Sequence, residues 1–229
     1  AFPYMDNYNY HKGMNGIIQE LTGLLKTKNI GTDSDRALLL DFQATLEIKP
    51  EKAIKLEKDA LAQIENITAD NARLVSNLHA NLGGLYRMNG HPDLAREHME
   101  KSISLLDQFN LLHINDSIPQ IANYAMFLTE QQEPERGISE LQKLSGIIKE
   151  YHSDDCLDYA KVQETLGTIY LMTANLPQAK THFKRAFKIY EKIWADEPEM
   201  IEAKYQEIQE LYPQIGFCIG KNLSGLLTK

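Results

Sequence analysis

The stretch NLGGLYRMNGHPDLAREHMEKS, residues 81–102, predicts two short antiparallel helices joined by a tight turn. Small residues let two helix backbones approach closely, and Gly83 lies where it would face Ala95 of the second helix. Pro92 suits the first turn of that second helix, because the first N–H groups of a helix have no partner inside it. The positions that would form the contact are Leu82, Gly83 and Tyr86 of the first helix and Ala95, Met99 and Ser102 of the second. One such hairpin cannot bury its own apolar face, which favours a repeat.

The pattern recurs in register every 42 residues. Gly83 is matched by Ala125 and Gly167 downstream and by Asp41 upstream. The prolines that would begin the second helices are evenly spaced, at Pro50, Pro92 and Pro134. One position of the second helix holds a small residue in every copy, namely Ala53, Ala95, Gly137 and Ala179. Four copies in register without gaps indicate a repeat protein in which each hairpin stacks on its neighbours.

Between Leu166 and Ala186 the pattern LG..Y........A...F..A resembles the tetratricopeptide repeat, whose usual unit is about 34 residues. The longer unit resembles the 42-residue variety typified by kinesin light chain. The resemblance covers residues 34–201, and the first copy departs from it most, with Asp41 at a Gly or Ala position and Ala44 at a Tyr position. It implies an all-α fold: an α-solenoid, a right-handed superhelix of antiparallel helix pairs with capping helices at both ends.

The sequence is therefore divided into an N-terminal lead-in and capping helix (1–33), four tetratricopeptide-like repeats and C-terminal capping helices (202–229). The repeats are expected at 34–75, 76–117, 118–159 and 160–201. Their first helices are predicted at 33–48, 72–89, 117–131 and 156–174, and their second helices at 50–66, 92–109, 134–152 and 177–196. Further helices are predicted at 12–28, 199–212 and 215–227. Thr32 or Asp33 can cap the helix that begins at residue 33.

The composition is that of a soluble globular chain, with 229 residues, 43% hydrophobic and 24% charged, a formal charge of −8 and a pI of about 5.4. No Lys- or Arg-rich run is found, so we expect no nucleic-acid binding by this segment. No apolar run approaches the ~18 residues of a membrane span and no signal peptide is visible, so we expect a cytoplasmic protein without a membrane partner. Cys156 and Cys218 lack metal or redox spacing and are expected to be reduced thiols.

A search for catalytic motifs finds none: GxxxxGK[ST], GxSxG and HExxH are all absent. His79, His91 and His98 show no metal-binding spacing. The Asp154-Asp155 pair is expected to cap a helix in a solvated turn. We therefore expect no enzymatic activity, no metal site and no cofactor.

In tetratricopeptide arrays the first helices line the concave face, so the resemblance implies that a ligand lies there. Asn81 and Asn123 occupy equivalent positions, at which an Asn of peptide-binding family members bonds the ligand backbone. An Asn amide has donors and an acceptor, so it can pair with an extended peptide whatever its sequence. Arg87 could hold a carboxylate, and Met side chains adapt to varied apolar partners. The candidate peptide-binding residues are Asn77, Asn81, Gly84, Arg87, Met88, Asn123, Met126, Lys161, Thr165 and Thr168.

These features predict a non-enzymatic scaffold that binds a protein or peptide in the concave groove of the array. Self-association into a homo-oligomer through the ends of the array is a further expectation. The alternative is a peptide-sensing regulatory domain of a larger bacterial transcriptional regulator or signalling ATPase, which the start at Ala1-Phe2-Pro3, without an initiator Met, motivates. A simpler interpretation of the two equivalent Asn residues is duplicated sequence on a solvated helix face.

Overall fold

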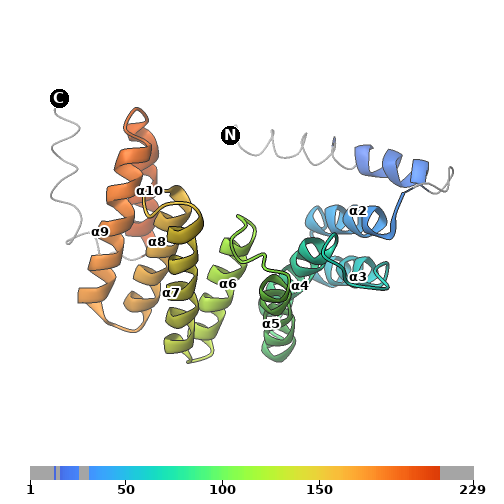
Figure 1. Ribbon diagram of the computed structural model, residues 1–229, viewed down its shortest axis with the longest axis horizontal. Helices are drawn as coiled ribbons and strands as arrows, with labels where there is room; N and C mark the ends of the chain where they lie inside the picture. Colours follow the sequence, from blue (N-terminus) through green and yellow to red (C-terminus); the bar gives the residue numbers. More distant parts are fainter. Residues whose placement is uncertain (1–12, 14–15, 26–30, 212–229) are drawn as a thin grey trace. The chain divides into compact units, whose positions relative to one another are not determined.

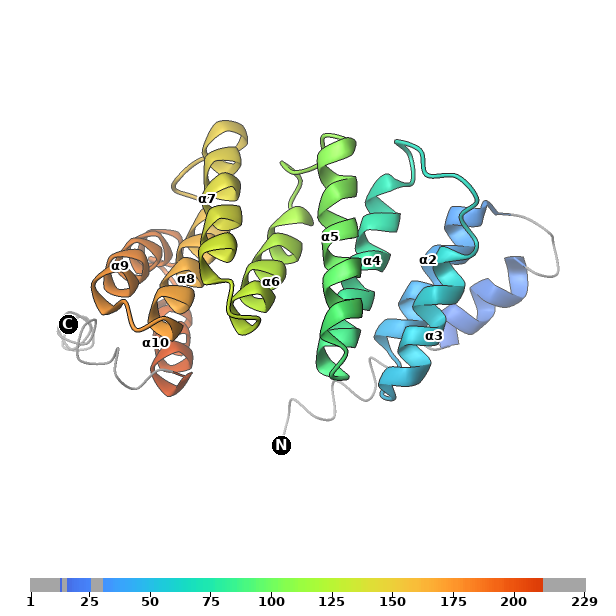
Figure 2. The same ribbon diagram turned by 90° about the horizontal axis from the view of Figure 1, so that it is seen from below.

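Figures 1 and 2 show a computed structural model in which the chain forms antiparallel helical pairs. The structure describes residues 13, 16–25 and 31–211, and these contain helices and turns but no strand. The chain divides into two compact units, of which unit 1 ends at Leu112 and unit 2 begins at His113. The predicted lead-in at 1–10 and the predicted helix at 215–227 lie outside the described residues.

Unit 1 begins with a helix at residues 16–25, inside the predicted range 12–28. Its other helices are α2 (Asp33–Thr45), α3 (Pro50–Leu61), α4 (Ala72–Met88) and α5 (Pro92–Gln108). Helices α2 and α3 form one pair, α4 and α5 form the next, and α4 also packs against the first pair. Ala37, Ala60 and Leu78 are fully buried where these helices meet.

Unit 2 contains α6 (Ser117–Glu130), α7 (Pro134–Tyr151), α8 (Leu157–Met172), α9 (Leu176–Ile193) and α10 (Pro198–Leu211). Helix α8 packs against α6, α7 and α9, and α10 contacts α9. The Glu164 carboxylate accepts hydrogen bonds from two neighbouring helices. The Tyr190 hydroxyl donates to Glu164 Oε2 at 2.6 Å, and Lys204 Nζ donates to Glu164 Oε1 at 3.1 Å. These bonds link α9 and α10 to α8.

The small residues of the hairpin seam lie where the repeat pattern predicts them. In the seam between α4 and α5, a Cβ added to Gly83 would lie 2.6 Å from Met99 Cγ and 3.3 Å from the Ala95 carbonyl oxygen. Separations this short leave no room for a side chain, so α4 and α5 approach through the glycine. The predicted close approach of Gly83 to Ala95 of α5 is confirmed.

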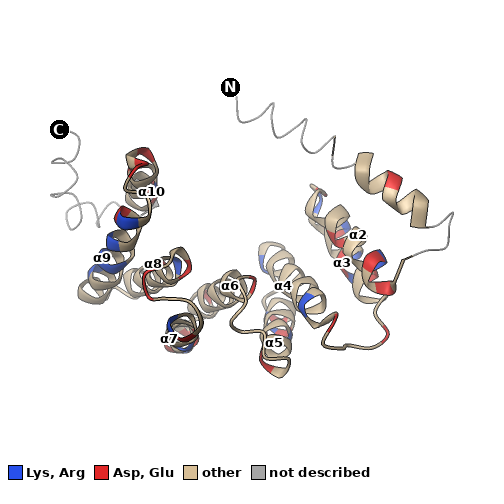
Figure 3. Cartoon of the chain, turned by 45° about the horizontal axis from the view of Figure 1, so that its top comes forward, with Lys and Arg blue, Asp and Glu red and all other residues tan. Residues whose placement is uncertain are grey.

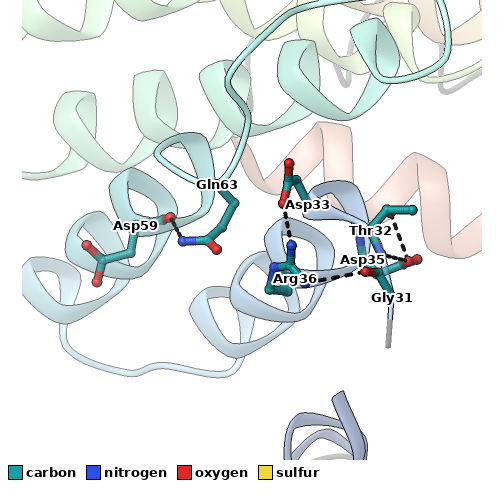
Figure 4. A network of polar contacts seen from close by, with 7 residues as sticks. All are labelled: Gly31, Thr32, Asp33, Asp35, Arg36, Asp59 and Gln63. Atoms are coloured by element: carbon teal, nitrogen blue, oxygen red, sulfur yellow. Dashed lines mark hydrogen bonds and ion pairs between the residues drawn. The ribbon is translucent and has the colours of Figure 1, made fainter. Parts of the chain in front are cut away.

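Figure 4 shows how α2 begins, with Thr32 as the N-cap residue. The Asp35 N–H donates to Thr32 Oγ1 at 3.2 Å, and the Thr32 N–H donates to Asp35 Oδ2 at 2.7 Å. This reciprocal capping box satisfies two N–H groups that the helix leaves without partners. It selects Thr32 from the two predicted caps, while Asp33 pairs with Arg36.

Three predicted helices are too long at their C-terminal ends, and one of them is α9, which ends at Ile193 rather than at residue 196. Helix α2 ends at Thr45 rather than at residue 48, and the residue before Pro50, Lys49, is extended at φ −89° and ψ 114°, as the proline favours. Helix α3 ends at Leu61 rather than at residue 66. There the Asn71 side chain organises the loop, accepting from the Thr68 N–H at 2.8 Å and donating to the Asn66 carbonyl at 2.9 Å.

Three helix ends share one turn geometry at the 42-residue spacing. Gly90, Gln132 and Ala174 follow α4, α6 and α8 with positive φ values of 75°, 68° and 59°. After each of them a backbone N–H closes the turn onto a carbonyl five residues back, as in His91 to Tyr86 at 2.9 Å. Only the first of the three is a glycine, so the sequence marks one of these turns clearly and leaves the other two without a signal.

Candidate functional site

The ten candidate residues lie on three first helices and in two units. Asn77, Asn81, Gly84, Arg87 and Met88 lie on α4 of unit 1, Asn123 and Met126 on α6 of unit 2, and Lys161, Thr165 and Thr168 on α8 of unit 2. Because α6 packs against α8, the structure brings the second and third groups together. The pairing of Asn81 with Asn123, which belong to different units, stays a prediction.

On the α6–α8 side of unit 2, Asn123 and Lys161 are exposed, and Met126 is half-buried. The Asn123 amide forms no hydrogen bond with any residue that the structure describes, so it is open to solvent. The two threonines instead bond to their own helix, Thr165 to the Lys161 carbonyl at 2.9 Å and Thr168 to the Glu164 carbonyl at 3.1 Å. Lys161 Nζ lies 3.7 Å from Asp158 Oδ1, so Asn123 is the exposed member of this set whose side chain has no bonding partner among the described residues.

On α4, Met88 is the most exposed candidate, at 79% exposure, and the other four are half-buried. Asn81 is already engaged: its Nδ2 donates to Asp41 Oδ1 at 2.9 Å and to Glu57 Oε1 at 3.1 Å. Asp41 belongs to α2 and Glu57 to α3, so this amide joins three helices. Its two donors serve the fold, whereas its oxygen accepts no hydrogen bond within the described part of the chain.

The two carboxyl groups beside Asn81 lie in a poorly solvated place. Glu57 is 1% exposed, and among the described residues nothing bonds its buried Oε2. Burial, followed by the negative charge of Asp41, raises the pKa of Glu57 to about 9, and burial also raises the pKa of Asp41. The two carboxyl groups therefore share one proton near neutral pH, and the larger rise in pKa is that of Glu57. Asp41 stands at a position where the family pattern has Gly or Ala, and here the Glu57 carboxyl group and the Asn81 amide accommodate it.

A histidine pair that the sequence did not predict lies across the seam of α4 and α5. His79 Nδ1 and His98 Nδ1 are 2.9 Å apart, and the His98 ring stacks on Tyr86 with centroids 5.4 Å apart. Burial, then the proximity of His98 and Lys101, lowers the pKa of His79 to about 4, and burial also lowers the pKa of His98. Both rings are thus neutral at pH 7, so one nitrogen donates and the other accepts. The two residues are 19 positions apart, on different helices, and no spacing rule connects them.

We expect this histidine pair to make unit 1 sensitive to acid. The pKa of His79 is lowered from its ordinary value of 6.5 to about 4, so the stabilisation is complete above pH 6.5 and is lost as the pH falls toward 4. The contribution of this pair to the free energy of unfolding should fall by about 1–2 kcal/mol between pH 7 and pH 5, while the Glu57–Asp41 pair changes stability in the opposite direction. Urea unfolding at both pH values isolates the contribution as the difference in unfolding free energy between the wild type and His79→Gln. That difference should fall from pH 7 to pH 5, whereas His91→Gln, which alters an exposed ring, should follow the wild type; a difference that stays the same at both pH values would contradict the assignment.

The Asp154-Asp155 pair does not cap α8, which corrects the sequence prediction. The N-cap residue is Cys156, and no side chain caps this helix. The two carboxylates instead contact lysines: Asp154 Oδ2 lies 3.9 Å from Lys149 Nζ, and Asp155 pairs with Lys192. The pair therefore joins the α7–α8 loop to α7 and α9.

Within residues 13, 16–25 and 31–211, no group of three or more His, Cys, Asp or Glu side chains is placed to hold a metal ion. In the same part of the chain, every helix is too short or too polar to cross a lipid bilayer. Cys156 is a free thiol whose Sγ lies 3.1 Å from the Ser153 carbonyl oxygen, and Cys218 lies outside the described residues.

Residues 117–192, which contain the pairs α6–α7 and α8–α9, match the family model of the tetratricopeptide repeat. Among solved structures, BtubC from P. vanneervenii has 19% identity and a TM-score of 0.67, over 80% of this chain and 72% of that chain. A Podosopora anserina protein assigned as a kinesin light chain, with nearly identical TPR-like repeats, has 15% identity and a TM-score of 0.64, over 82% and 92%. MamA has 15% identity and a TM-score of 0.54, over 82% and 94%. No curated protein compared matches the chain in sequence. The structures share its fold, an α-solenoid of helix pairs.

Proposed function

We propose that this tetratricopeptide repeat protein is a non-enzymatic scaffold that binds an extended peptide segment of a partner protein along its first helices. Tetratricopeptide helix pairs are a scaffold for protein interaction, and the fold alone does not select a partner. The proposal therefore rests on the α6–α8 face of unit 2, defined by Asn123, Met126, Lys161, Thr165 and Thr168.

The observation that carries the proposal is the exposed Asn123 amide. Asn123 lies on α6, which packs against the first helix α8 of the next pair. Its side chain makes no hydrogen bond to the described residues, so a ligand would have no such bond to displace. Its N–H and C=O groups suit the alternating acceptors and donors of an extended peptide backbone. Met126 supplies adaptable apolar surface one turn away. Asn81 is a weaker candidate, because its donors already bond Asp41 and Glu57.

We expect Asn123→Ala to weaken peptide binding about tenfold, because two neutral hydrogen bonds to a ligand backbone are worth about 1–2 kcal/mol together. Short random peptides displayed on phage would be selected against the wild-type chain. Synthetic copies of the selected peptides would then be titrated by fluorescence anisotropy against the wild type and the variant.

The matched control is Gln142→Ala, which removes an exposed amide from the second helix α7 of the same unit. Selected peptides should bind this control as they bind the wild type. Circular dichroism should report equal helix content in all three proteins. If Asn123→Ala and Gln142→Ala bind the selected peptides equally well, the α6–α8 face is not the binding surface.

The alternative function, a peptide-sensing domain of a larger regulator, gains no support from the comparisons. Catalysis is not part of the proposal, because the family match and the structural neighbours support an interaction scaffold. Self-association through the ends of the array stays an expectation, which a sizing measurement would test.

A further inference from the structure

Helix α9 has a charge opposite to that of the chain as a whole. The chain carries 24 basic and 32 acidic residues, yet Glu191 is the acidic residue of Leu176–Ile193. Its basic residues are Lys180, Lys184, Arg185, Lys188 and Lys192, all of them exposed. Four of these recur at every fourth position and so share one side of the helix. Figure 3 shows this concentration of Lys and Arg along α9.

Beside this row of lysines, unit 2 has a hollow of about 700 Å³. We call it the basic hollow; its lining includes Lys149 from α7 and Lys184, Arg185, Lys188 and Lys192 from α9. Tyr159 of α8 and Ile189 also line it and are buried, at 3% and 4% exposure, so part of its floor is apolar. The hollow lies at α7, α9, the α7–α8 loop and the first turn of α8, and its lining includes none of the residues that define the α6–α8 face.

Carboxylates already occupy the end of the hollow nearest the α7–α8 loop. Asp154 approaches Lys149 at 3.9 Å, and Asp155 pairs with Lys192. Further along α9, Lys184 and Lys188 have no ion-pair partner among the residues that the structure describes. The hollow thus contains two lysines that bind carboxylates of the chain itself and two that are available to carboxylates from outside.

The spacing of the lysines matches that of an extended acidic peptide. Residues four apart on an α-helix are about 6 Å apart along its axis. Alternate side chains of an extended strand point the same way and are separated by about 6.7 Å. A strand that runs along α9 with an acidic side chain at every second position would therefore meet successive lysines.

We propose that the basic hollow binds a short, extended, acidic segment of a partner protein, with Lys184 and Lys188 contacting its carboxylates. The apolar floor formed by Tyr159 and Ile189 suits the methylene groups of glutamate side chains. A longer polyanion such as a nucleic acid would meet Asp154 and Asp155 at one end of the hollow and, outside it, a chain of net charge −8, which disfavours it.

The test titrates the full chain with a fluorescein-labelled peptide that has glutamate at alternate positions, and with the same peptide in which every glutamate is glutamine. Only the acidic peptide should bind at low salt, and its Kd should rise with salt concentration. The Lys184→Gln, Lys188→Gln double variant should weaken binding about tenfold, because it removes two ion pairs. The control double variant Lys52→Gln, Lys55→Gln removes two exposed positive charges from α3 instead and should leave the Kd unchanged.

A second variant should change affinity in the opposite direction. Asp154→Asn with Asp155→Asn frees Lys149 and Lys192 and removes two repulsive charges, so the acidic peptide should bind about tenfold more tightly. A merely structural role of the loop carboxylates would not produce this gain.

Three results would overturn the proposal: no binding of the acidic peptide by the wild type, equal losses in the two lysine double variants, or tighter binding of a single-stranded oligonucleotide of equal charge at the same lysines. Asn123→Ala should leave acidic-peptide binding unchanged. The basic hollow and the α6–α8 face can therefore fail independently.

Discussion

Replacing Glu57 by Gln should stabilise unit 1 by about 2 kcal/mol at pH 8 and should flatten its pH dependence. Glu57 is buried beside Asp41 on the neighbouring helix, and Asn81 donates to both groups. Glutamine is neutral at every pH, keeps the oxygen that accepts from Asn81, and offers an N–H toward the Asp41 carboxylate. The variant therefore preserves the contacts and removes the cost of protonating or burying a charge.

The pH dependence that Glu57 gives to the stability of unit 1 follows from the direction of its pKa shift. The pKa of Glu57 is raised from an ordinary value of 4.5 to about 9 in the folded protein. The folded state therefore binds the proton more tightly than the unfolded state, and the stabilisation is complete below pH 4.5 and is lost as the pH rises toward 9. Together with the His79–His98 pair, which loses its stabilisation below pH 6.5, this gives unit 1 maximal stability in mildly acidic solution.

Hydrogen exchange of the α3 and α4 amides, measured from pH 6 to pH 9 in the full chain, reports on unit 1 directly. Glu65→Gln, in the exposed loop after α3, is the matched control and should behave as the wild type. A Glu57→Gln variant that is less stable than the wild type at pH 8 would show that Glu57 is ionised in the folded protein.

Gly137→Ala should destabilise unit 2 by about 2 kcal/mol, although alanine is the better helix former. Gly137 is buried in the first turns of α7, and an added Cβ would lie 2.6 Å from the Ala125 carbonyl oxygen of α6 and 3.3 Å from the carbonyl and α carbons of that residue. These atoms belong to the backbone, so no side-chain rotation can relieve the overlap. The helices α6 and α7 would have to separate along their seam.

The same helix supplies the control. Gly146 is exposed on α7, and a Cβ added there would meet nothing within 4 Å. Gly146→Ala should therefore stabilise unit 2 by about 0.5–1 kcal/mol through helix propensity alone. Trp194, the one tryptophan of the chain, stacks on Tyr190 in unit 2 at 4.8 Å and provides a fluorescence signal for urea unfolding. If both alanine variants shift the midpoint in the same direction, close approach at Gly137 does not determine the packing.

Much of the fold follows from one-dimensional pattern, as α5 and α7 illustrate. Each was predicted to begin at its proline and does so, at Pro92 and Pro134. The small residues Gly83 and Gly137 were placed at the seams by their 42-residue register, and there an added Cβ would overlap a neighbouring helix. Spacing along a helix decides which residues share a face, so these predictions need no knowledge of the partner helix.

The candidate site was predictable in part. The exposure of Asn123 agrees with the outward direction that helical periodicity assigns to it. Asn81 occupies the equivalent position, yet it bonds carboxyl groups 24 and 40 residues away in sequence. The four-residue spacing of the lysines on α9 was visible in the sequence and could have identified the basic face, whereas a search for contiguous basic runs missed it.

The sequence by itself determined the all-α class, the hairpin repeat, the helix starts and the seams, because each depends on residue type at a fixed spacing along one chain. Only the tertiary structure decided that Glu57 meets Asp41, that His79 meets His98, and that Asp155 pairs with Lys192 rather than capping α8. Such pairs depend on the rotation and axial offset of one helix against another. Those offsets are set by the packing of all the apolar side chains between the helices, and no local pattern encodes them.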